Sequence, residues 1–464
     1  MLIMKHFITL LFVLLFLGIN ASHASVFAGE ITFRQTGPLE IEASVYLYFR
    51  ESAVPPQANY SPICWGDGNC TSIPITNGDD TDGDGFPDGQ MIGHEYRLMV
   101  YTGTYTYEEA GTYTLSVRPA FRPSSILNLN APNSDQVPFN VYATANVSET
   151  DQGNHAPILY EAPLIDEAVV NFPYRHTPNA FDPDGDEVRY QLETPTIDST
   201  IAFPYYELPD VLLPGPDNQL SIDPLTGVLE WDSPQRSGRY VIAIKVSTFR
   251  DGILQDEIVR DMLIDVKDEM ELPPWLDLSD ETPLREISVG DTLRIDATAS
   301  SLPEDDTVMI SASGGPFDYF GGGASFDDSS TPPDAAGQFE WVAEPEDVRE
   351  EPYQVVFVAR EPTSRLSDLK AIRIKVNALT NTAEETTLPS ALKAYPNPSK
   401  AIVHIELPAP DVRYQLTDAQ GRKVGAGMFN KSTAELDIGS LPNGWYVLSC
   451  WQNGKYLGQV RLVK

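Results

Sequence analysis

Alternation of apolar and polar residues at every second position is the feature that most restricts the fold of this chain. It recurs in GTYTLSVR at 111–118, DTLRIDATA at 291–299 and AIRIKVN at 371–377. A period of two is typical of a strand with one buried face in an antiparallel sheet. No long helical repeat follows residue 24, and the 38 prolines would interrupt most helices. The pattern therefore predicts an all-β protein built from β-sandwiches in series.

Proline-bearing polar stretches predict where one sandwich ends and the next begins. They occur at 151–159, 267–276 and 377–390, and the last is expected to be a flexible linker because it is Thr- and Glu-rich without periodicity. The predicted division is 1–24, 25–150, 151–268, 269–377, 378–390 and 391–464. We call residues 25–150, 151–268 and 269–377 the first, second and third segments. A chain of this length is too long for a single core.

The N-terminus has the pattern of a secretory signal peptide. Lys5 and His6 precede an apolar run at 7–19, and small residues follow at Ser22 and Ala24. An uncleaved anchor helix is the alternative, but the run is short for a bilayer, which takes about 20 apolar residues. We expect cleavage after Ala24, export of the chain, and no transmembrane span in the mature protein.

The chain is strongly acidic. Its formal net charge is −36 at neutral pH, from 67 acidic and 31 basic residues. Such a surface repels nucleic acid and anionic lipid, and it attracts divalent cations. Solubility alone also accounts for most of this charge. Nucleic acid is therefore not expected as a partner.

The cysteines are few and unevenly placed. Cys64 and Cys70 flank the short loop CWGDGNC, whereas Cys450 stands alone. In an exported chain the first two are expected to form a local disulfide, with two buried thiols as the alternative. Zinc is not expected, because no neighbouring His or second Cys pair completes a site.

The string DDTDGDGFPDG at 79–89 has the spacing of a calcium-binding loop. The expected ligands are the side chains at loop positions 1, 3, 5 and 9 and the carbonyl at position 7, namely Asp80, Asp82, Asp84, Asp88 and Phe86. Gly85 occupies position 6, where such a loop turns sharply. Met91 replaces the bidentate Glu at position 12, so we expect a weak Ca²⁺ site completed by Asp79, Glu95 or water. The string also resembles thrombospondin type 3 repeats, and a solvated acidic loop is the alternative.

The C-terminal residues carry several short motifs in a definite order. AYPNPS at 394–399 is followed by DAQGRKV at 418–424, by LDIGSLPNGWYVLS at 436–449 and by a terminal RLVK. This segment resembles the C-terminal sorting domain of the Bacteroidetes type IX secretion system. The resemblance implies export by the type IX machinery, removal of the domain, and either attachment to surface polysaccharide or release. A secreted or outer-surface location is expected, with an ordinary fourth β-domain as the alternative.

The first segment resembles PKD-type immunoglobulin-like domains. It contains WGDG at 65–68 and YTYEEAGTYTLSV at 105–117. Tyr105 and Tyr107 stand where that family usually has His-x-Tyr or His-x-Phe, a change that leaves the predicted fold intact. Such domains are usually spacers without chemistry of their own.

The second segment resembles bacterial cadherin-like immunoglobulin repeats. It contains AFDPDGDEVRYQLE, LSIDPLTGVLEWDSP and GRYVIAIKVST, and the third segment is expected to be a diverged copy. Cadherin-like repeats bind calcium between domains, which implies a second metal site at Asp182, Asp184 and Asp186, with Asn154 or Asp151. A β-turn whose aspartates bond their own backbone is the alternative.

Catalysis finds little support in the sequence. His94, His155, His176 and His404 are scattered and lack a nucleophile elbow or HExxH spacing, so we do not expect an enzyme. Two aromatic loops are candidate ligand sites, with Tyr205 and Tyr206 in one and Tyr319 and Phe320 in the other. Exposed rings stack on sugars or anchor protein contacts, although they also commonly cap a sandwich.

These features predict an adhesive or structural surface protein, a calcium-stiffened immunoglobulin-like rod that presents loops to a glycan or protein ligand. The alternative is a carbohydrate-binding protein that assists polysaccharide capture or degradation.

Overall fold

The computed structural model of the chain is almost entirely β-structure, as the sequence predicts. It describes residues 25–54, 58–92, 95–130, 133–150, 154–163, 167–215, 217–268, 271–301, 307–318, 323–330, 335–378, 392–407, 409–418, 422–452 and 455–464. The predicted signal peptide and residues 379–390 of the predicted linker lie outside these ranges. The chain divides into two compact units, residues 1–379 and 380–464.

The strands of the first segment form two antiparallel runs that belong to one twelve-stranded sheet. One run contains β1 (Val26–Gly37), β2 (Glu40–Arg50), β6 (Tyr96–Thr106) and β5 (Gln90–Ile92). The other contains β4 (Cys70–Pro74), β3 (Tyr60–Cys64), β7 (Gly111–Val117) and β8 (Val141–Val147). Short 3-10 turns lie between strands at Glu51–Ala53, Leu127–Leu129 and Ser134–Gln136.

The second segment is built on two long central strands, β18 (Gly238–Arg250) and β19 (Ile253–Lys267), with β13 (Glu187–Glu193) beside β18. Shorter strands complete it: β9 (Ile158–Leu159), β10 (Ala168–Val169), β11 (Tyr174–His176), β12 (Ala180–Phe181), β14 (Thr196–Asp198), β15 (Ile201–Ala202), β16 (Leu220–Ile222) and β17 (Leu229–Trp231). Its one described helix is the single turn α2 (Pro209–Leu212).

The third segment is a sandwich of two four-stranded sheets. One has the order β20 (Trp275–Leu278), β22 (Thr292–Ser300), β25 (Ala335–Val342), β24 (Ala324–Asp328). The other has the order β21 (Leu284–Ser288), β27 (Ser367–Asn377), β26 (Tyr353–Arg360), β23 (Met309–Gly314), and β21 pairs in parallel with β27. The single turn α3 (Gly315–Asp318) and a 3-10 turn at Pro345–Asp347 complete it.

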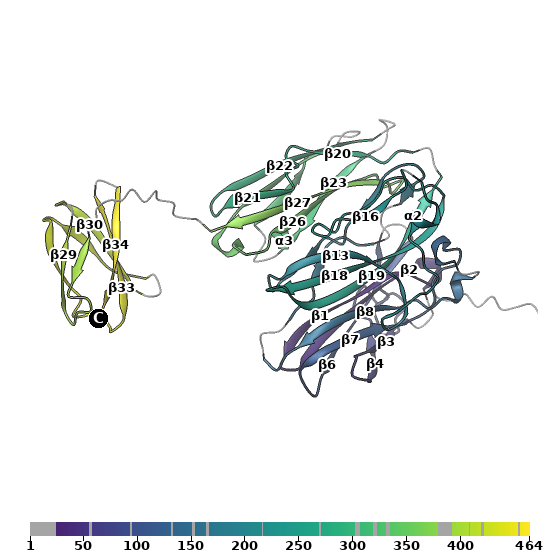
Figure 1. Cartoon of the computed structure of the whole chain (residues 1–464), viewed down its shortest axis with the longest axis horizontal. Coiled ribbons are helices and arrows are strands. Elements are labelled where there is room, and N and C mark those ends of the chain that lie inside the picture. The colour runs from purple at the N-terminus through teal and green to yellow at the C-terminus, as the bar shows by residue number, and fades with distance from the viewer. Residues whose placement is uncertain are drawn as a thin grey trace, which may run out of the picture. The chain divides into compact units, whose positions relative to one another are not determined.

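The strand pairing joins the first two segments rather than keeping them apart. One side of β19 pairs along its length with β18, and the other side pairs with β8 and with β1. The two central strands of the second segment therefore lie in the same sheet as β1 and β8 of the first (Figure 1). One continuous hydrophobic cluster runs through both segments. The boundary predicted near residue 150 is therefore a chain connection between sandwiches that share a sheet and a core.

Two buried ion pairs cross this junction. Arg122, which follows β7, makes two bonds of 2.7 and 2.6 Å to Asp261 on β19. Arg260, also on β19, bonds Glu30 on β1 at 2.6 and 2.9 Å. All four side chains are at most 5% exposed. Charges this deeply buried are held only when paired and hydrogen-bonded, so separating the two segments here would break both pairs.

The alternation read from the sequence appears directly in the strands that have one buried face. In β22 every second residue is buried, including Leu293, Ile295 and Ala297. In β18, by contrast, the run 240–244 is buried throughout. Central strands covered on both faces lose the period of two, so β18 reads as a continuous apolar run.

Residues 392–464 form a small sandwich of two sheets. One sheet has the order β28 (Lys393–Tyr395), β29 (Ile402–Glu406), β32 (Thr433–Asp437), and the other β31 (Lys423–Phe429), β30 (Val412–Asp418), β33 (Trp445–Gln452), β34 (Lys455–Val463). Its core is a separate cluster that includes the free thiol of Cys450. Burial raises the pKa of this thiol to about 11.

Candidate functional sites

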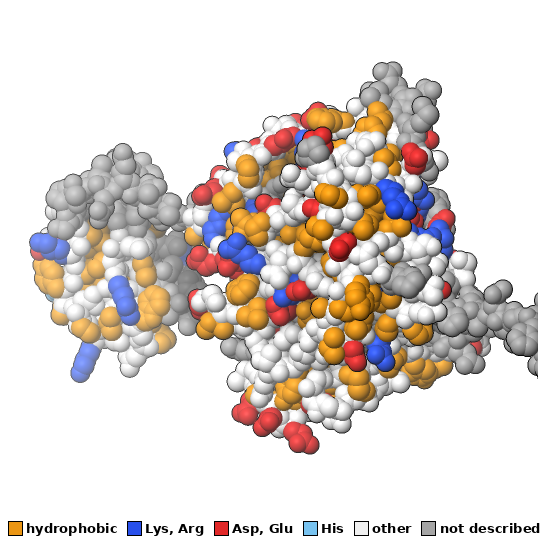
Figure 2. All heavy atoms as spheres, turned by 45° about the vertical axis from the view of Figure 1, so that its right-hand side comes forward, with side chains coloured by type: hydrophobic (Ala, Val, Ile, Leu, Met, Phe, Trp, Pro, Cys, Tyr) orange, Lys and Arg blue, Asp and Glu red, His pale blue; other side chains and the backbone are white. Residues whose placement is uncertain are grey.

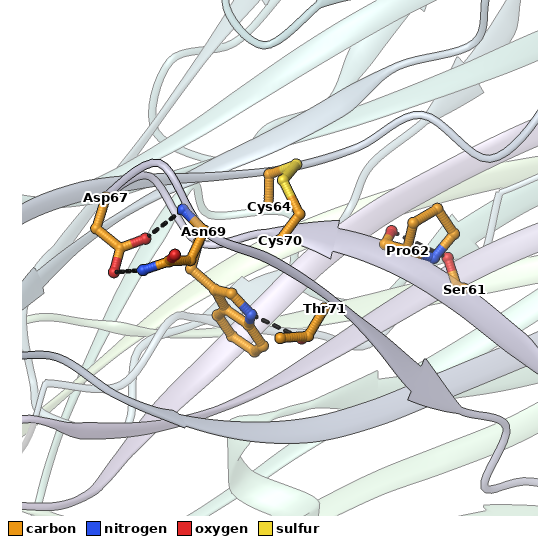
Figure 3. Close-up of a disulfide and its surroundings, with 8 residues drawn as sticks. Ser61, Pro62, Cys64, Asp67, Asn69, Cys70 and Thr71 are labelled. Atoms are coloured by element: carbon orange, nitrogen blue, oxygen red, sulfur yellow. Dashed lines mark hydrogen bonds between the residues drawn. A yellow bond between two sulfur atoms is a disulfide. The ribbon is translucent and has the colours of Figure 1, made fainter.

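The disulfide loop joins β3 to β4 in the first segment. Cys64 ends β3 and Cys70 begins β4, and the two form a disulfide (Figure 3). Within the loop, Asp67 accepts hydrogen bonds from the backbone and the side chain of Asn69 at 2.9 and 3.0 Å. The indole of the buried Trp65 donates to the Thr71 hydroxyl at 2.8 Å. The WGDG turn is thus held by the disulfide and by hydrogen bonds within the loop.

The predicted calcium loop lies between β4 and β5, and it is largely exposed. Carboxylate oxygens of Asp80, Asp82 and Asp88 lie within 4.8 Å of one another. Asp80 also accepts bonds from the backbone of Gly83 and Gly85 at 2.7 and 3.0 Å, with Gly85 at a φ of +93°. The loop is therefore folded around three of its predicted ligands.

The other predicted members of this loop are engaged elsewhere. Asp84 accepts bonds from the Phe86 backbone at 2.9 Å and from the side chain of Asn59 at 2.7 Å. Glu95 bonds Arg50 and does not belong to the cluster of Asp80, Asp82 and Asp88. The Phe86 ring packs edge-on against Tyr60 with centroids 5.2 Å apart. A cation at this loop would rely on three carboxylates plus backbone oxygens or water.

The second predicted cluster sits in the turn between β12 and β13, where the first and second segments meet. Oxygens of Asp182, Asp184 and Asp186 lie within 4.8 Å of one another. Asp184 accepts bonds from the backbone N–H and Nδ1 of His155 at 2.8 Å each, and Asp186 pairs with Arg250 at 2.7 and 2.9 Å. The turn is therefore tied both to the inter-segment connection and to the end of β18.

Asp182 has the most deeply buried carboxyl of this cluster. It is 1% exposed, one oxygen accepts from the Asp186 backbone at 2.9 Å, and Oδ2 has no partner among the described residues. Burial, with smaller contributions from Asp186 and Asp184, raises the pKa of its carboxyl to about 7. A buried oxygen without a donor costs free energy, and a bound cation would recover it.

Asp256 joins this neighbourhood, and the sequence analysis missed it. It lies on β19, is 1% exposed, and accepts bonds from Asn154 Nδ2 at 2.5 Å and from the Thr248 hydroxyl at 3.3 Å. Burial, followed by the charge of Asp182, raises the pKa of Asp256 well above its ordinary value. The available signal was an aspartate near the start of an otherwise buried central strand, where such residues are rare.

Asn154 contributes a second unsatisfied oxygen. Its amide nitrogen is used by Asp256, whereas its Oδ1 is buried without a partner among the described residues. The junction thus contains four carboxylates and an amide carbonyl, with two orphan oxygens at Asp182 and Asn154. Hard oxygen donors of this kind fit Ca²⁺, which takes six to eight of them.

Of the two tyrosines predicted to bind a ligand in the loop at 203–206, only Tyr205 is largely exposed. Tyr205 is 66% exposed, and its ring meets Phe203 edge-on. The hydroxyl of Tyr206 is instead buried without a partner among the described residues, and burial raises its pKa. These two tyrosines do not form a joint exposed platform. Tyr319 and Phe320 of the other predicted loop lie outside the described residues.

The histidines considered for catalysis are dispersed over separate elements. His155 bonds Asp184, His176 is buried on β11, and His404 on β29 lies 3.5 Å from Glu435. His94 lies outside the described residues. On the face shown in Figure 2, acidic side chains form separate groups interspersed with Lys and Arg.

Comparison with known proteins identifies the C-terminal sandwich. Residues 393–463 match the family described as the secretion system C-terminal sorting domain. The sandwich is a type IX sorting domain. The protein is therefore secreted or at the cell surface, and it interacts with the type IX secretion machinery through this domain. Among the described residues, no helix has the length and apolar character needed to cross a membrane.

The remaining comparisons are weak. No curated protein matches the chain. The EC1–4 region of Drosophila N-cadherin is 15% identical over 89% of this chain and 94% of that one, with a TM-score of 0.20. An ICAM-5 ectodomain fragment is 11% identical over 92% and 96%, with a TM-score of 0.18. An endo-fucoidan hydrolase of glycoside hydrolase family 107 is 13% identical over 74% and 42%, with a TM-score of 0.17. At such TM-scores these matches carry no argument, and the fold class rests on the strand topology above.

Proposed function

We propose that this secreted protein is a non-catalytic adhesive or structural component of the cell surface, whose immunoglobulin-like segments are stiffened by calcium. The observation that carries the proposal is the pair of buried, unpartnered oxygens at Asp182 and Asn154 beside Asp184 and Asp256. A cation bound there would bridge residues that precede β9, the β12–β13 turn and β19. It would therefore stiffen the connection between the first two segments.

The sorting domain supports the cellular part of the proposal. After export, we expect it to be removed, with the remaining segments attached to surface polysaccharide or released. The exposed loop at 79–89 is proposed as a second, weaker calcium site, since it has fewer fixed oxygens and is open to solvent.

Thermal unfolding of the full chain in 1 mM calcium and in chelator tests the proposal. A site of ~0.1 mM affinity adds about 1.4 kcal/mol at that concentration, which raises the melting temperature by several degrees. We expect Asp184→Asn to remove most of this rise and Asp82→Ala with Asp84→Ala to remove a smaller part.

Asp280→Asn is the matched control, because Asp280 holds an ordinary exposed turn by accepting from the Thr282 backbone at 2.9 Å. This variant should keep the full calcium response. The absence of any rise in the wild type would refute calcium binding. A rise that survives Asp184→Asn but is lost with the loop variant would refute stiffening at the junction.

A further inference from the structure

Trp275 is an exposed aromatic residue at the edge of a sheet. It begins β20, the outer strand of its sheet, where Leu276 and Leu278 point into the core and Trp275 is 64% exposed. A single exposed apolar residue needs no explanation by itself. Here, however, the indole borders a hollow that also contains fixed polar groups.

The hollow lies between the second and third segments, which pack within one compact unit. Its volume is about 350 Å³, within the range of roughly 300–1,000 Å³ usual for small-molecule sites. Its apolar wall comes from Phe172, Pro173, Pro273 and Pro274 together with Trp275. Three prolines and two aromatic rings give a wall whose shape changes little on binding.

Arg175 and Asp368 form the polar wall. Asp368 is 9% exposed and accepts from Arg175 Nη1 at 2.8 Å and from the Leu276 backbone at 3.2 Å. Arg175 also donates to Glu230 at 3.1 and 2.7 Å from Nε and Nη2. These bonds use three of the five N–H donors of a guanidinium, so two remain for a ligand in a fixed orientation. Ser300 and Ser367 add hydroxyls that both donate and accept.

The charges around the hollow are paired. Lys370 lies over the Trp275 ring at 5.9 Å, and its ammonium pairs with Asp277 at 3.6 Å and with Glu281. Arg175 is held between Asp368 and Glu230. A charged ligand would have to compete with these pairs, so the site favours a neutral ligand rich in hydroxyl groups.

We propose that the hollow beside Trp275 binds a neutral saccharide. A sugar ring has an apolar C–H face, which stacks on the indole, and an edge of hydroxyls, which exchange hydrogen bonds with Arg175, Asp368 and the two serines. The ligand class follows from this combination of an open aromatic surface, mixed donors and acceptors, and no free charge. The inference uses none of the calcium-site residues, so it stands or falls separately from the proposed stiffening.

Calorimetric titration of the full chain tests the inference, with neutral hexasaccharides of β-1,4-glucan, α-1,4-glucan, β-1,3-glucan, β-1,4-xylan and β-1,4-mannan as probes. Titrations are made in chelator and repeated with calcium. We expect at least one probe to bind in both conditions, and Trp275→Ala to weaken that binding roughly tenfold or more, as loss of a stacking ring does. Trp275→Phe should retain part of the affinity.

Trp445→Ala is the matched control. Trp445 is another exposed tryptophan, 40% exposed, with the Arg461 guanidinium over its ring at 5.1 Å, but it lies in the sorting domain. Its loss should leave sugar binding unchanged. Melting curves of both variants should match the wild type, since neither ring is in a core.

Three outcomes would overturn the inference. One is that no probe binds at concentrations up to about 10 mM, which corresponds to a negligible affinity. Another is that Trp275→Ala binds as tightly as the wild type. The third is that a protein ligand, and no saccharide, is retained in a Trp275-dependent way. If the calcium proposal fails, these three results are unchanged, because the saccharide titrations are made in chelator as well as with calcium.

Discussion

Removing Arg122 should destabilise the junction between the first two segments strongly. Arg122 and Asp261 are 2% and 1% exposed, and Arg122→Met would leave the Asp261 carboxylate buried with neither of its bonds of 2.7 and 2.6 Å. Breaking one side of a buried pair costs about 3–5 kcal/mol. For a unit of this size, that lowers the melting temperature by roughly 10 °C. Since β1, β8 and β19 share one sheet, the loss should affect the transition of both segments together.

Denaturant unfolding of the full chain, followed by tryptophan fluorescence, measures this cost. Arg34→Met is the control, because the Arg34–Glu42 pair is 60% and 29% exposed and should contribute at most about 1 kcal/mol. The double variant Arg122→Met with Asp261→Leu should recover most of the stability, since two apolar groups can replace a buried pair. The reasoning is refuted if Arg122→Met costs no more than Arg34→Met, or if the first segment unfolds separately from the second in the wild type.

Three further outcomes are expected. Burial lowers the pKa of His176 to about 3, below its ordinary value of 6.5, so its stabilising contribution is complete above pH 6.5 and is lost as the pH falls towards 3. The unfolding free energy of the wild type relative to His176→Leu should therefore fall by about 2 kcal/mol between pH 6.5 and 5, and a constant difference would contradict this. Cys64→Ser with Cys70→Ser should cost about 2 kcal/mol in denaturant unfolding, because the disulfide spans only 6 positions, and reducing agent should then have no further effect. Gly66→Ala should destabilise by about 1–3 kcal/mol, since its φ is +88° and the new Cβ would lie 2.6 Å from the Thr114 backbone nitrogen. Gly68→Ala, with a similar φ but open space around it, should cost less when both variants are measured by denaturant unfolding.

The sequence by itself determined the local structure and the destination of this protein. Strands such as β22, with Leu293 and Ile295 inward, are visible as a period of two because only one face is buried. The sorting domain was recognised from short turn and strand motifs in order, and it was predicted at 391–464 against the matched 393–463. The aspartates of both acidic turns were also found, because their spacing is local.

Only the tertiary structure decided how the segments combine and what surrounds each site. The pairing of β19 with β1 links residues about 230 positions apart, and no local pattern in either strand specifies that partner. Asp256 reaches the junction, and Arg175 and Asp368 reach the hollow beside Trp275, through the same kind of distant packing. Periodicity records which face of a strand is buried, whereas the side chains that meet across sheets depend on how complete sheets pack, and that information is spread over the whole chain.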